Sequence, residues 1–355
     1  MSVLDPSALM RDAFLAMSRQ TAVRDTMVKL PVTNKVVSRY VPGEDFADAV
    51  RDCANLVAQG RTVTVDHLGE DITDLAQATA TKDAYLRYIK DMSDAGLSTD
   101  GTVEFSLKLS ALGQFVGKDG EKVALENARE IARAAANAGT TISLDMEDHT
   151  TTDSTLGILR ELRQDFPGTG AVLQAYLHRT QADCRDLSGE GSRVRLCKGA
   201  YAEPESVAFQ DDHEVDLNYV ECAKILMNGQ GYPMMATHDP NMIDIAGFLA
   251  DSAGRSTDSW EYQMLYGIRP HEEGRLIDEG YQVRVYLPNG PDWYGYFMRR
   301  LAERPANVMF FARSLFSKGL RAGAGPGRAD PHHGGRQRRD GAHRRGGSGP
   351  RGSPG

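Results

Sequence analysis

Residues 102–145, TVEFSLKLSALGQFVGKDGEKVALENAREIARAAANAGTTISLD, contain two short β-rich runs on either side of one long amphipathic stretch. The runs TVEFSLK (102–108) and TTISLD (140–145) are rich in β-branched and aromatic residues, which favour strands. Between them, EKVALENAREIARAAANAG (121–139) has helical periodicity and ends in a glycine, as helices commonly do. A strand, a helix and a strand in this order predict a βαβ unit of a parallel sheet.

The same alternation continues on both sides of this unit. We count eight candidate strands, at 61–66, 102–108, 140–145, 171–176, 193–197, 233–237, 260–265 and 281–286. Eight βα units that close on themselves form a (β/α)8 barrel, so we expect an α/β fold of the TIM-barrel type. A doubly wound open sheet is the alternative, but no GxGxxG motif follows the first strand, which weakens a dinucleotide-binding fold of that kind.

The 355 residues divide into three predicted parts. Residues 1–60 are expected to form an N-terminal helical segment and residues 61–318 the catalytic barrel. Residues 319–355 form a Gly/Arg/Pro tail, which is expected to be disordered because it has no Leu, Ile, Val, Met or aromatic residue after Leu320. The composition changes abruptly after FFARSLFSKG (310–319), so our hypothesis is that the tail results from a reading-frame error. An RNA-binding Arg/Gly tail is the alternative.

Charge and composition limit the class of protein. The tail carries eight arginines and two aspartates, a net charge of +6, which leaves −14 on residues 1–318 and argues against nonspecific nucleic-acid binding. No run of 18 apolar residues and no signal peptide is present, which predicts a soluble, cytoplasmic protein. The four cysteines lack metal-type spacing, so neither disulfides nor a zinc site is expected.

Polar residues gather where the predicted strands end. In (β/α)8 barrels the carboxyl ends of the strands meet at one mouth, which holds the active site. Each residue alone is weak evidence, because surface loops are polar too, but nearly every predicted strand delivers one. These strand-end residues are Asp66, His67, Lys108, Asp145, Met146, Glu147, Gln174, Arg195 to Lys198, Thr237, His238, Asp239 and Tyr286.

An arginine pair follows the last predicted strand. Arg299 and Arg300 lie in WYGYFMRRLAERPANV (293–308), a helical stretch rich in aromatic residues, and Glu303 lies four residues after Arg299. Guanidinium groups bind carboxylates through paired hydrogen bonds, so these arginines are candidates for holding an amino-acid substrate. A solvated basic helix face is the alternative, and the flanking aromatic residues argue for a partly enclosed setting.

Lys108 and Asp145 are further candidates. Lys108 interrupts an apolar run, so it is expected to pair with an acid and a substrate carboxylate, to act as a Schiff-base nucleophile, or to lie on the surface. Asp145 is either an acid that holds these cations or a helix N-cap. The turn KGAY (198–201) follows a strand with two alternating arginines and would allow a phosphate to approach closely. His238 lacks a second ligand at metal-type spacing.

Several motifs, in this order, together resemble the proline dehydrogenase family. They are SLKLSALG (106–113), ISLDMED (142–148), VLQAY (172–176), RLCKGAY (195–201), ATHD (236–239), YQMLYG (262–267), RVYLPNG (284–290) and YFMRRLAER (296–304). The resemblance covers roughly residues 30–315 and extends to bacterial monofunctional enzymes and to the dehydrogenase domain of the bifunctional proline utilisation enzyme. It implies a distorted (β/α)8 barrel with noncovalent FAD that oxidises L-proline to Δ1-pyrroline-5-carboxylate and passes electrons to a membrane quinone.

The resemblance also implies roles for individual residues. Asp145 and Arg195 match catalytic positions, Arg195 beside the flavin N5 and Asp145 as the acid that pairs with the lysine. Substrate-binding positions are matched by Lys108, Arg299, Arg300, Tyr286, Tyr296, Leu265 and Glu303, the last as the ion-pair partner of the arginine clamp. FAD-contacting positions are matched by Met146, Gln174, Arg195, Lys198, Gly199, Ala200, Thr237 and His238.

Two positions bear on specificity and cofactor binding. Relatives that prefer hydroxyproline have a smaller residue where this chain has Tyr286, so proline is the expected substrate. Ala202 stands where the bifunctional enzymes have a tryptophan against the adenine, which leaves the adenine packing open. Delivery of the product to a pyrroline-5-carboxylate dehydrogenase and peripheral contact with the inner face of the membrane are further expectations. A Schiff-base lyase and a catalytically inactive barrel are the competing functions.

Overall fold

The computed structural model of this chain describes residues 37–69 and 72–302. They belong to the first of two units of the chain, Met1–Phe311, and the second unit begins at Ala312. The tail 319–355, Glu303 and most of the predicted helical segment 1–60 therefore lie outside the described residues.

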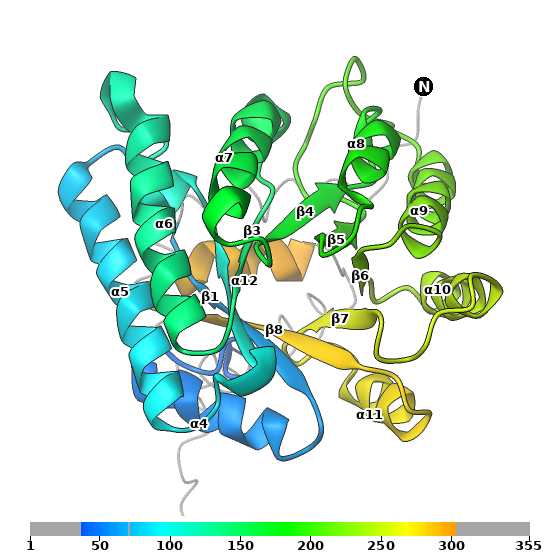
Figure 1. The fold of residues 1–355 in the computed structure, drawn as a ribbon, viewed down its shortest axis with the longest axis horizontal. Coiled ribbons are helices and arrows are strands. Elements are labelled where there is room, and N and C mark those ends of the chain that lie inside the picture. The colour runs from blue at the N-terminus through cyan, green and yellow to red at the C-terminus, as the bar shows by residue number, and fades with distance from the viewer. Residues whose placement is uncertain (1–36, 70–71, 303–355) are drawn as a thin grey trace, which may run out of the picture. The chain divides into compact units, whose positions relative to one another are not determined.

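Eight parallel strands close into a barrel in chain order, with β1 pairing with both β2 and β8 (Figure 1). This confirms the predicted (β/α)8 fold. The strands are β1 (Thr62–His67), β2 (Val103–Leu107), β3 (Ile142–Leu144), β4 (Gly170–Gln174), β5 (Arg193–Cys197), β6 (Tyr232–Ala236), β7 (Glu261–Leu265) and β8 (Val283–Asn289).

All eight predicted strands exist, but most of their ends differ from the prediction. The predicted third strand began at Thr140, whereas β3 begins at Ile142, because the N–H of Thr140 still donates to the carbonyl oxygen of Ala135 in the preceding helix, at 2.9 Å, and pairing with β2 begins at Ile142. The predicted eighth strand ended at Tyr286, whereas β8 continues to Asn289. Its last three residues pair with β1. Local propensity does not encode this contact, because the first and last strands of the barrel are far apart in the sequence.

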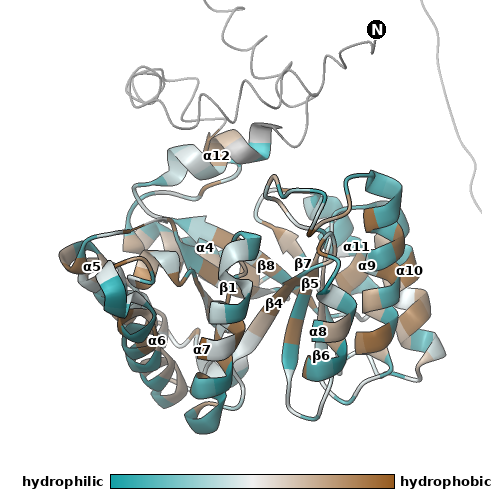
Figure 2. Ribbon diagram, turned by 90° about the horizontal axis from the view of Figure 1, so that it is seen from above, coloured by the Kyte–Doolittle hydropathy of each residue, from teal (hydrophilic) through white to brown (hydrophobic). Residues whose placement is uncertain are grey.

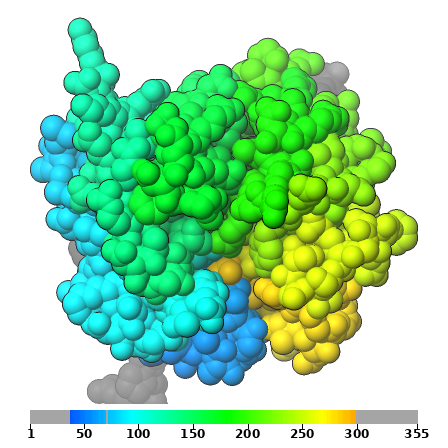
Figure 3. All heavy atoms as spheres, viewed as in Figure 1, coloured from blue at the N-terminus to red at the C-terminus, as the bar shows by residue number. Residues whose placement is uncertain are grey.

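Helices surround the barrel and bury their apolar faces against it. α6 buries Ala124, Ala128 and Ile131, which recur at helical spacing, and Gly139 follows it with φ +78° as predicted. The ring helices alternate between hydrophilic and hydrophobic residues along their length (Figure 2), and the surface is hollowed near its centre in the space-filling view (Figure 3). The helices are α5 (Leu75–Asp94), α6 (Gly120–Asn137), α7 (Thr152–Asp165), α8 (Thr180–Leu187), α9 (Asp212–Met227), α10 (Pro240–Ser252) and α11 (Pro270–Asp278), with short 3-10 turns η1 (Thr99–Gly101), η2 (Ser110–Leu112), η3 (Gly117–Asp119) and η4 (His149–Thr151).

Two helices give the barrel its distortion. α4 (Phe46–Val57), which precedes β1, packs against both β1 and β8 and so occupies the place outside the closing pair of strands. α12 (Trp293–Ala302) follows β8 and lies across one end of the barrel, apart from the ring (Figures 1 and 2). None of the described helices is long and apolar enough to cross a membrane.

The apolar core lies between the strands and the surrounding helices. Along β7, Tyr262 and Met264 belong to this core, so Glu261, Gln263 and Leu265 alternate with them and face the barrel interior. The interior is consequently lined by polar and charged side chains. This alternation is what brings the functional residues of different strands together.

Candidate active site

The mouth of the barrel holds an ion-paired lysine. Lys108, directly after β2, donates to both carboxylate oxygens of Asp66 at the end of β1, over 2.6 and 2.7 Å. Its Nζ lies 3.8 Å from Oδ2 of Asp145, so the predicted pairing with Asp145 exists but is the longer contact. Burial raises the pKa of Asp66, and the ammonium of Lys108 opposes that rise. The pair thus holds a cation at the mouth between two acids.

Asp145, directly after β3, joins side chains from three other strands. Its Oδ1 accepts hydrogen bonds from Ser106 at 2.6 Å and from Nη1 of Arg195 at 2.7 Å. Its Oδ2 accepts one from the hydroxyl of Tyr286 at 2.6 Å. Burial, and then the charges of Asp145 and Asp66, raise the pKa of Tyr286 well above its usual value, so this hydroxyl stays a donor. Asp145 is therefore not a helix N-cap but an acceptor that holds side chains of three strands in place.

Arg195 in β5 is buried at the centre of this cluster, with 4% of its surface exposed. Its Nε donates to Oε1 of Gln263 at 2.6 Å, and Nη1 also lies 3.1 Å from Oγ of Ser106. Its Nη2 is buried without a hydrogen-bond partner; the acid paired with it, Glu104, is 3.8 Å away. Burial lowers the pKa of Arg195, but Asp145 and its other partners outweigh burial, so the pKa lies above its usual value. The guanidinium thus stays charged, and its third nitrogen faces Glu104 inside the barrel.

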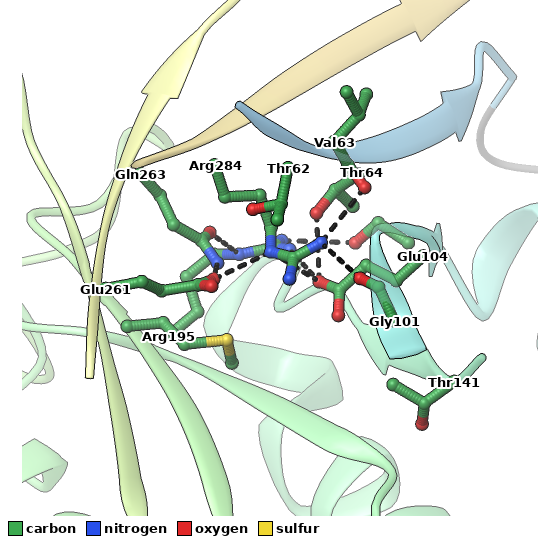
Figure 4. Close-up of polar contacts among 12 residues, drawn as sticks. Thr62, Val63, Thr64, Gly101, Glu104, Thr141, Arg195, Glu261, Gln263 and Arg284 are labelled. Atoms are coloured by element: carbon green, nitrogen blue, oxygen red, sulfur yellow. Dashed lines mark hydrogen bonds and ion pairs between the residues drawn. The ribbon is translucent and has the colours of Figure 1, made fainter. Parts of the chain in front are cut away.

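Below the mouth, charged side chains cross the barrel interior (Figure 4). Glu104 in β2 accepts from Arg193 at 2.7 Å and from Thr64 at 2.9 Å. Glu261 in β7 accepts from Arg284 in β8 at 2.8 Å. Burial alone would raise the pKa of Glu104, but the surrounding guanidiniums lower it to about 2. This layer joins strands from opposite sides of the barrel beneath Arg195 and supports it.

The turn after β5 holds a second lysine. Lys198 forms ion pairs with Asp216 in α9 and, at 2.9 Å, with Asp239, which caps the N-terminus of α10. Burial lowers the pKa of Lys198, but the two aspartates outweigh it and raise the pKa. Gly199 has φ +119°, and a Cβ there would lie 2.4 Å from the ring of Tyr176. A glycine is required, which fixes the course of the predicted phosphate-binding turn.

The remaining predicted cofactor residues lie on neighbouring strand ends. Gln174 donates to the carbonyl oxygen of Glu147 at 2.8 Å, and Nε2 of His238 accepts from the backbone of Leu265 at 2.9 Å. Oγ1 of Thr237 accepts from the backbone of Asp239 at 3.1 Å. Met146 is buried and Ala200 is exposed. The carboxyl ends of strands β3 to β7 therefore meet at the same mouth of the barrel.

α12 supplies the predicted arginine clamp. Tyr296 is buried, and the guanidinium of Arg300 lies 5.2 Å from the centre of its ring. Trp293 donates to Glu44 at 2.6 Å, which ties the start of α12 to the segment before α4. The side chain of Arg299 and all of Glu303 lie outside the described residues. Of the two arginines predicted to form the clamp, Arg300 is thus the one whose surroundings the structure shows.

Known proteins resemble this chain over most of its length. The profile of the proline dehydrogenase family matches residues 49–313. Proline dehydrogenase 2 of Bacillus subtilis is 38% identical over 309 residues, which cover 87% of this chain and 99% of the relative. Proline dehydrogenase of Deinococcus radiodurans is 39% identical over 282 residues, which cover 79% of this chain and 90% of the relative.

The chain belongs to the proline dehydrogenase family.

The proline dehydrogenase fold also occurs in longer relatives. The structure of proline utilization A from Bdellovibrio bacteriovorus superposes with a TM-score of 0.70 at 25% identity, covering 76% of this chain and 32% of that one. The bifunctional protein PutA of Escherichia coli is 27% identical over 316 residues, which cover 78% of this chain and 24% of that protein. This chain corresponds to the proline dehydrogenase part of these proteins, and as a member of the family it is an oxidoreductase of proline catabolism.

Sequence analysis missed several residues of this proline dehydrogenase site. Asp66 is named there as a strand-end residue but receives no role, although it is the closest partner of Lys108. The signal for the interior residues was present, because polar residues alternate along their strands at the period of a sheet. Those without a predicted role are Ser106, Glu104, Glu261, Gln263 and Arg284.

Proposed function

We propose that this chain oxidises L-proline to Δ1-pyrroline-5-carboxylate with a noncovalently bound FAD and passes the electrons to a quinone. The observation that carries the proposal is the pair of cations at the mouth of the barrel: Lys108 and Arg195 both contact Asp145, and Asp66 also holds Lys108. Cations held in place by acids in this way suit an anionic substrate group and the negative charge of a reduced cofactor. Membership of the proline dehydrogenase family supports the choice of proline and of FAD.

The residues at the mouth fit a flavin dinucleotide. Arg195 would hold the flavin ring, and Lys198 with the turn at Gly199 would hold the diphosphate, since an ammonium and a close backbone suit phosphate oxygens. Met146, Gln174, Ala200, Thr237 and His238 are the other proposed contacts. When bound, FAD supplies the oxidant that accepts two electrons from the substrate.

The proline carboxylate would be held by cations on two elements. Lys108 comes from β2, and Arg299 and Arg300 come from α12, with Glu303 as the proposed ion-pair partner of the clamp. The walls of the pocket would be Leu265, Tyr286 and Tyr296, from β7, β8 and α12. Clamping the carboxylate between the barrel and α12 would orient the ring of proline over its site of oxidation.

The residues around Asp145 would hold charge without taking up the proton of the substrate. Asp145 receives three hydrogen bonds, from Ser106, Arg195 and Tyr286, which take up three of the about four acceptor positions of a carboxylate. Proline must lose its amine proton before its C–H bond is oxidised, because the electron pair of nitrogen drives that step. We propose that proline binds as the neutral amine.

The electron acceptor and partners follow from the same proposal. We propose a membrane quinone as the acceptor, reached by peripheral contact with the membrane from a cytoplasmic location. The product would pass to a pyrroline-5-carboxylate dehydrogenase; the relatives named PutA are described as bifunctional, which supports this link. We also propose residues 61–318 as the catalytic barrel, preceded by a helical segment and followed by a tail that lies outside it.

An absorbance spectrum of the purified protein before and after anaerobic addition of L-proline tests the proposal. We expect a visible flavin band that bleaches with L-proline and stays unchanged with D-proline. Release of the cofactor on acid denaturation would show that it is noncovalent. A colourless protein, or a yellow one that L-proline leaves oxidised, would overturn the proposed function.

A further inference from the structure

The last residue of β8, Asn289, connects the barrel to the segment before α4. It is fully buried, and its Nδ2 donates to the backbone oxygen of Gly43 at 2.8 Å. Its Oδ1 accepts from the hydroxyl of Tyr88, in α5, at 2.5 Å. A backbone oxygen can only accept, so Gly43 determines which end of the amide faces it. The amide of Asn289 is therefore held in one orientation, by one partner at each end.

This orientation is reinforced from His67, at the end of β1. A hydroxyl has one hydrogen, and Tyr88 gives it to Asn289, so Nδ1 of His67, 3.3 Å from the hydroxyl oxygen, is the donor in their contact. Burial lowers the pKa of His67 to about 4, so the imidazole is neutral at neutral pH and has its proton on Nδ1. His67, Tyr88 and Asn289 thus form a chain of hydrogen bonds with a single direction, and a satisfied chain of this kind is rigid.

The segment before α4 also holds α12. Glu44 accepts from the indole of Trp293, in the first turn of α12, at 2.6 Å. The ring centre of Tyr40 lies 6.1 Å from that of Phe297, one turn further along α12. We call residues 40–44 the docking segment. It contacts two successive turns of α12 on one side and the end of the barrel on the other.

Asn289 ties the docking segment to the barrel close to the start of α12. Residues 290–292 alone separate Asn289 from Trp293. Because α12 begins so soon after the carboxyl end of β8, it lies at the mouth of the barrel (Figure 2). The position of α12, and of Arg300 in its last turn, therefore depends on how firmly Asn289 holds the docking segment.

We propose that Asn289 is a positioning residue, which holds the docking segment against the end of β8 and thereby keeps α12 where Arg300 binds the carboxylate of the substrate. The inference rests on the proposed function, because it needs Arg300 in the carboxylate clamp. Asn289 is fully buried and bonded to Tyr88 and Gly43, so its effect on the substrate passes through α12.

The first test replaces Asn289 by Leu and measures KM for L-proline, kcat and the FAD content. The variant keeps the size of the side chain and loses both hydrogen bonds. We expect KM for L-proline to rise about tenfold, because a displaced clamp loses much of a charge-assisted contact, while the FAD content stays that of the unmodified enzyme. Asn228→Leu is the matched control, because Asn228 is exposed at the end of α9 and its Nδ2 also donates to a backbone oxygen at 2.8 Å.

A competitive inhibitor shows whether the substrate carboxylate is what Asn289 affects. Cyclopentanecarboxylate has the ring and the carboxylate of proline but no amine. Its inhibition constant should rise in Asn289→Leu by the same factor as KM for L-proline, because both molecules would lose the same clamp. A residue that only stabilises the fold would lower the melting temperature and leave both constants unchanged.

The second test approaches the docking segment from α12, with Trp293→Phe. Phenylalanine keeps an aromatic ring at this position but has no N–H to donate to Glu44. If Asn289 and Trp293 position α12 through the same segment, the double variant should raise KM by less than the product of the two single increases. Independent effects would give the full product and would contradict the proposal.

The outcomes separate this inference from the proposed function. If the unmodified protein lacks flavin or is not reduced by L-proline, both fall. If it is reduced, but Asn289→Leu keeps the KM and the inhibition constant of the unmodified enzyme, the positioning role alone is wrong. The same holds if only KM changes, or if Asn228→Leu raises KM as far. Should Asn289→Leu fail to fold, Asn289→Thr, whose side chain suits a strand and is one bond shorter, decides the question by the same two constants.

Discussion

At the scale of single residues, the site depends on how its buried charges are paired. Lys108 contacts two acids, and its closest partner is Asp66, which is 1% exposed. Asp145 is shared by donors from β2, β5 and β8. Removing one member of such a pair leaves an uncompensated charge, which costs more than the pair itself contributes. The effect of a substitution here therefore includes the cost of leaving the partner of the substituted residue buried and unpaired.

Substitution of Lys108 by Met is expected to weaken proline binding and to leave FAD bound. The substitution removes a charge-assisted contact to the substrate carboxylate, worth about 1.5–3 kcal/mol, so KM for proline should rise by about tenfold to a hundredfold. Steady-state kinetics and the flavin content of the purified variant measure both effects. Lys118→Met, at an exposed position in η3, is the control. An unchanged KM in Lys108→Met would remove Lys108 from the carboxylate clamp.

The pH dependence of catalysis is expected to follow the substrate rather than the site. The pKa of Tyr286 is raised well above its usual value by burial and by the charge of Asp145, so Tyr286 stays protonated across the working range. As the pH rises from about 6 to about 9, more proline loses its amine proton and kcat/KM should increase.

A comparison of kcat/KM profiles for the unmodified enzyme and Tyr286→Phe checks this assignment. The variant should show a lower kcat/KM with the same apparent pKa, because the hydroxyl orients Asp145 but does not titrate in this range. A flat profile would contradict binding of the neutral amine. A profile that loses its pH dependence only in Tyr286→Phe would instead assign the titration to the tyrosine.

At the scale of elements, the turn between β5 and α9 shows how a backbone constraint serves the site. Lys198 is presented there between Asp216 and Asp239, on the two helices that follow β5 and β6. Gly199 permits the turn because its φ is +119° and Tyr176 occupies the space where a Cβ would lie. The course of the chain at this point thus depends on the absence of a side chain.

Gly199→Ala is expected to weaken FAD binding more than Gly191→Ala. Both glycines have positive φ, +119° and +73°, but only at Gly199 would the added methyl meet another group, the ring of Tyr176. The strain at Gly199 should cost about 1–3 kcal/mol and displace Lys198. Flavin fluorescence titration gives the FAD affinity, and melting temperatures with and without FAD give the stability. Equal losses in both variants would refute a role for this turn in cofactor binding.

The helix before the first strand, α4, takes the place that the helix after the last strand has in a regular (β/α)8 barrel. α4 covers β1 and β8, where the helix after the last strand would otherwise pack. α12 is therefore available to lie across one end of the barrel, held by Trp293 on Glu44 and by the ring contact of Phe297 with Tyr40. With the arginine-bearing helix in this place, the proposed clamp would hold a small substrate from two sides.

At the scale of the whole molecule, the interior of the barrel is charged rather than apolar. Glu104 is fully buried among Arg193, Arg195 and Arg284, and its pKa is lowered to about 2 although burial by itself would raise it. The folded pKa thus lies below the ordinary value of 4.5. The stabilisation that ionised Glu104 gives the folded protein is fully present when the pH is above 4.5, and it is lost as the pH falls toward about 2.

Stability is therefore expected to fall in acid partly through Glu104. The shift corresponds to roughly 3 kcal/mol of unfolding free energy between neutral pH and strong acid. Urea unfolding at a series of pH values measures it, with Glu104→Gln losing this part of the pH dependence and Glu121→Gln, exposed in α6, keeping it. The slope that remains includes His67, whose pKa burial lowers to about 4. If Glu104→Gln keeps the full acid dependence, the assignment is wrong.

The sequence by itself determined the fold and the main candidates for the site. Alternating apolar runs fixed the number of strands and their order, because burial of one strand face and one helix face is a local property of the chain. The strand-end residues Lys108, Asp145 and Arg195 could be named for the same reason. Strand limits were less certain, as at Thr140 and Asn289, since pairing with a distant neighbour extends or shortens a strand.

The tertiary structure decided which of these residues meet. Asp66 and Lys108 are 42 residues apart, and Gln263 and Arg195 are 68 apart, so no local pattern pairs them. Closing the barrel turned alternate residues of each strand inward, where the interior admits a charge only beside an opposite charge or a hydrogen-bond partner. That requirement, imposed by three-dimensional packing, selected Asp66 as the partner of Lys108 and placed Asp145 among donors from three strands.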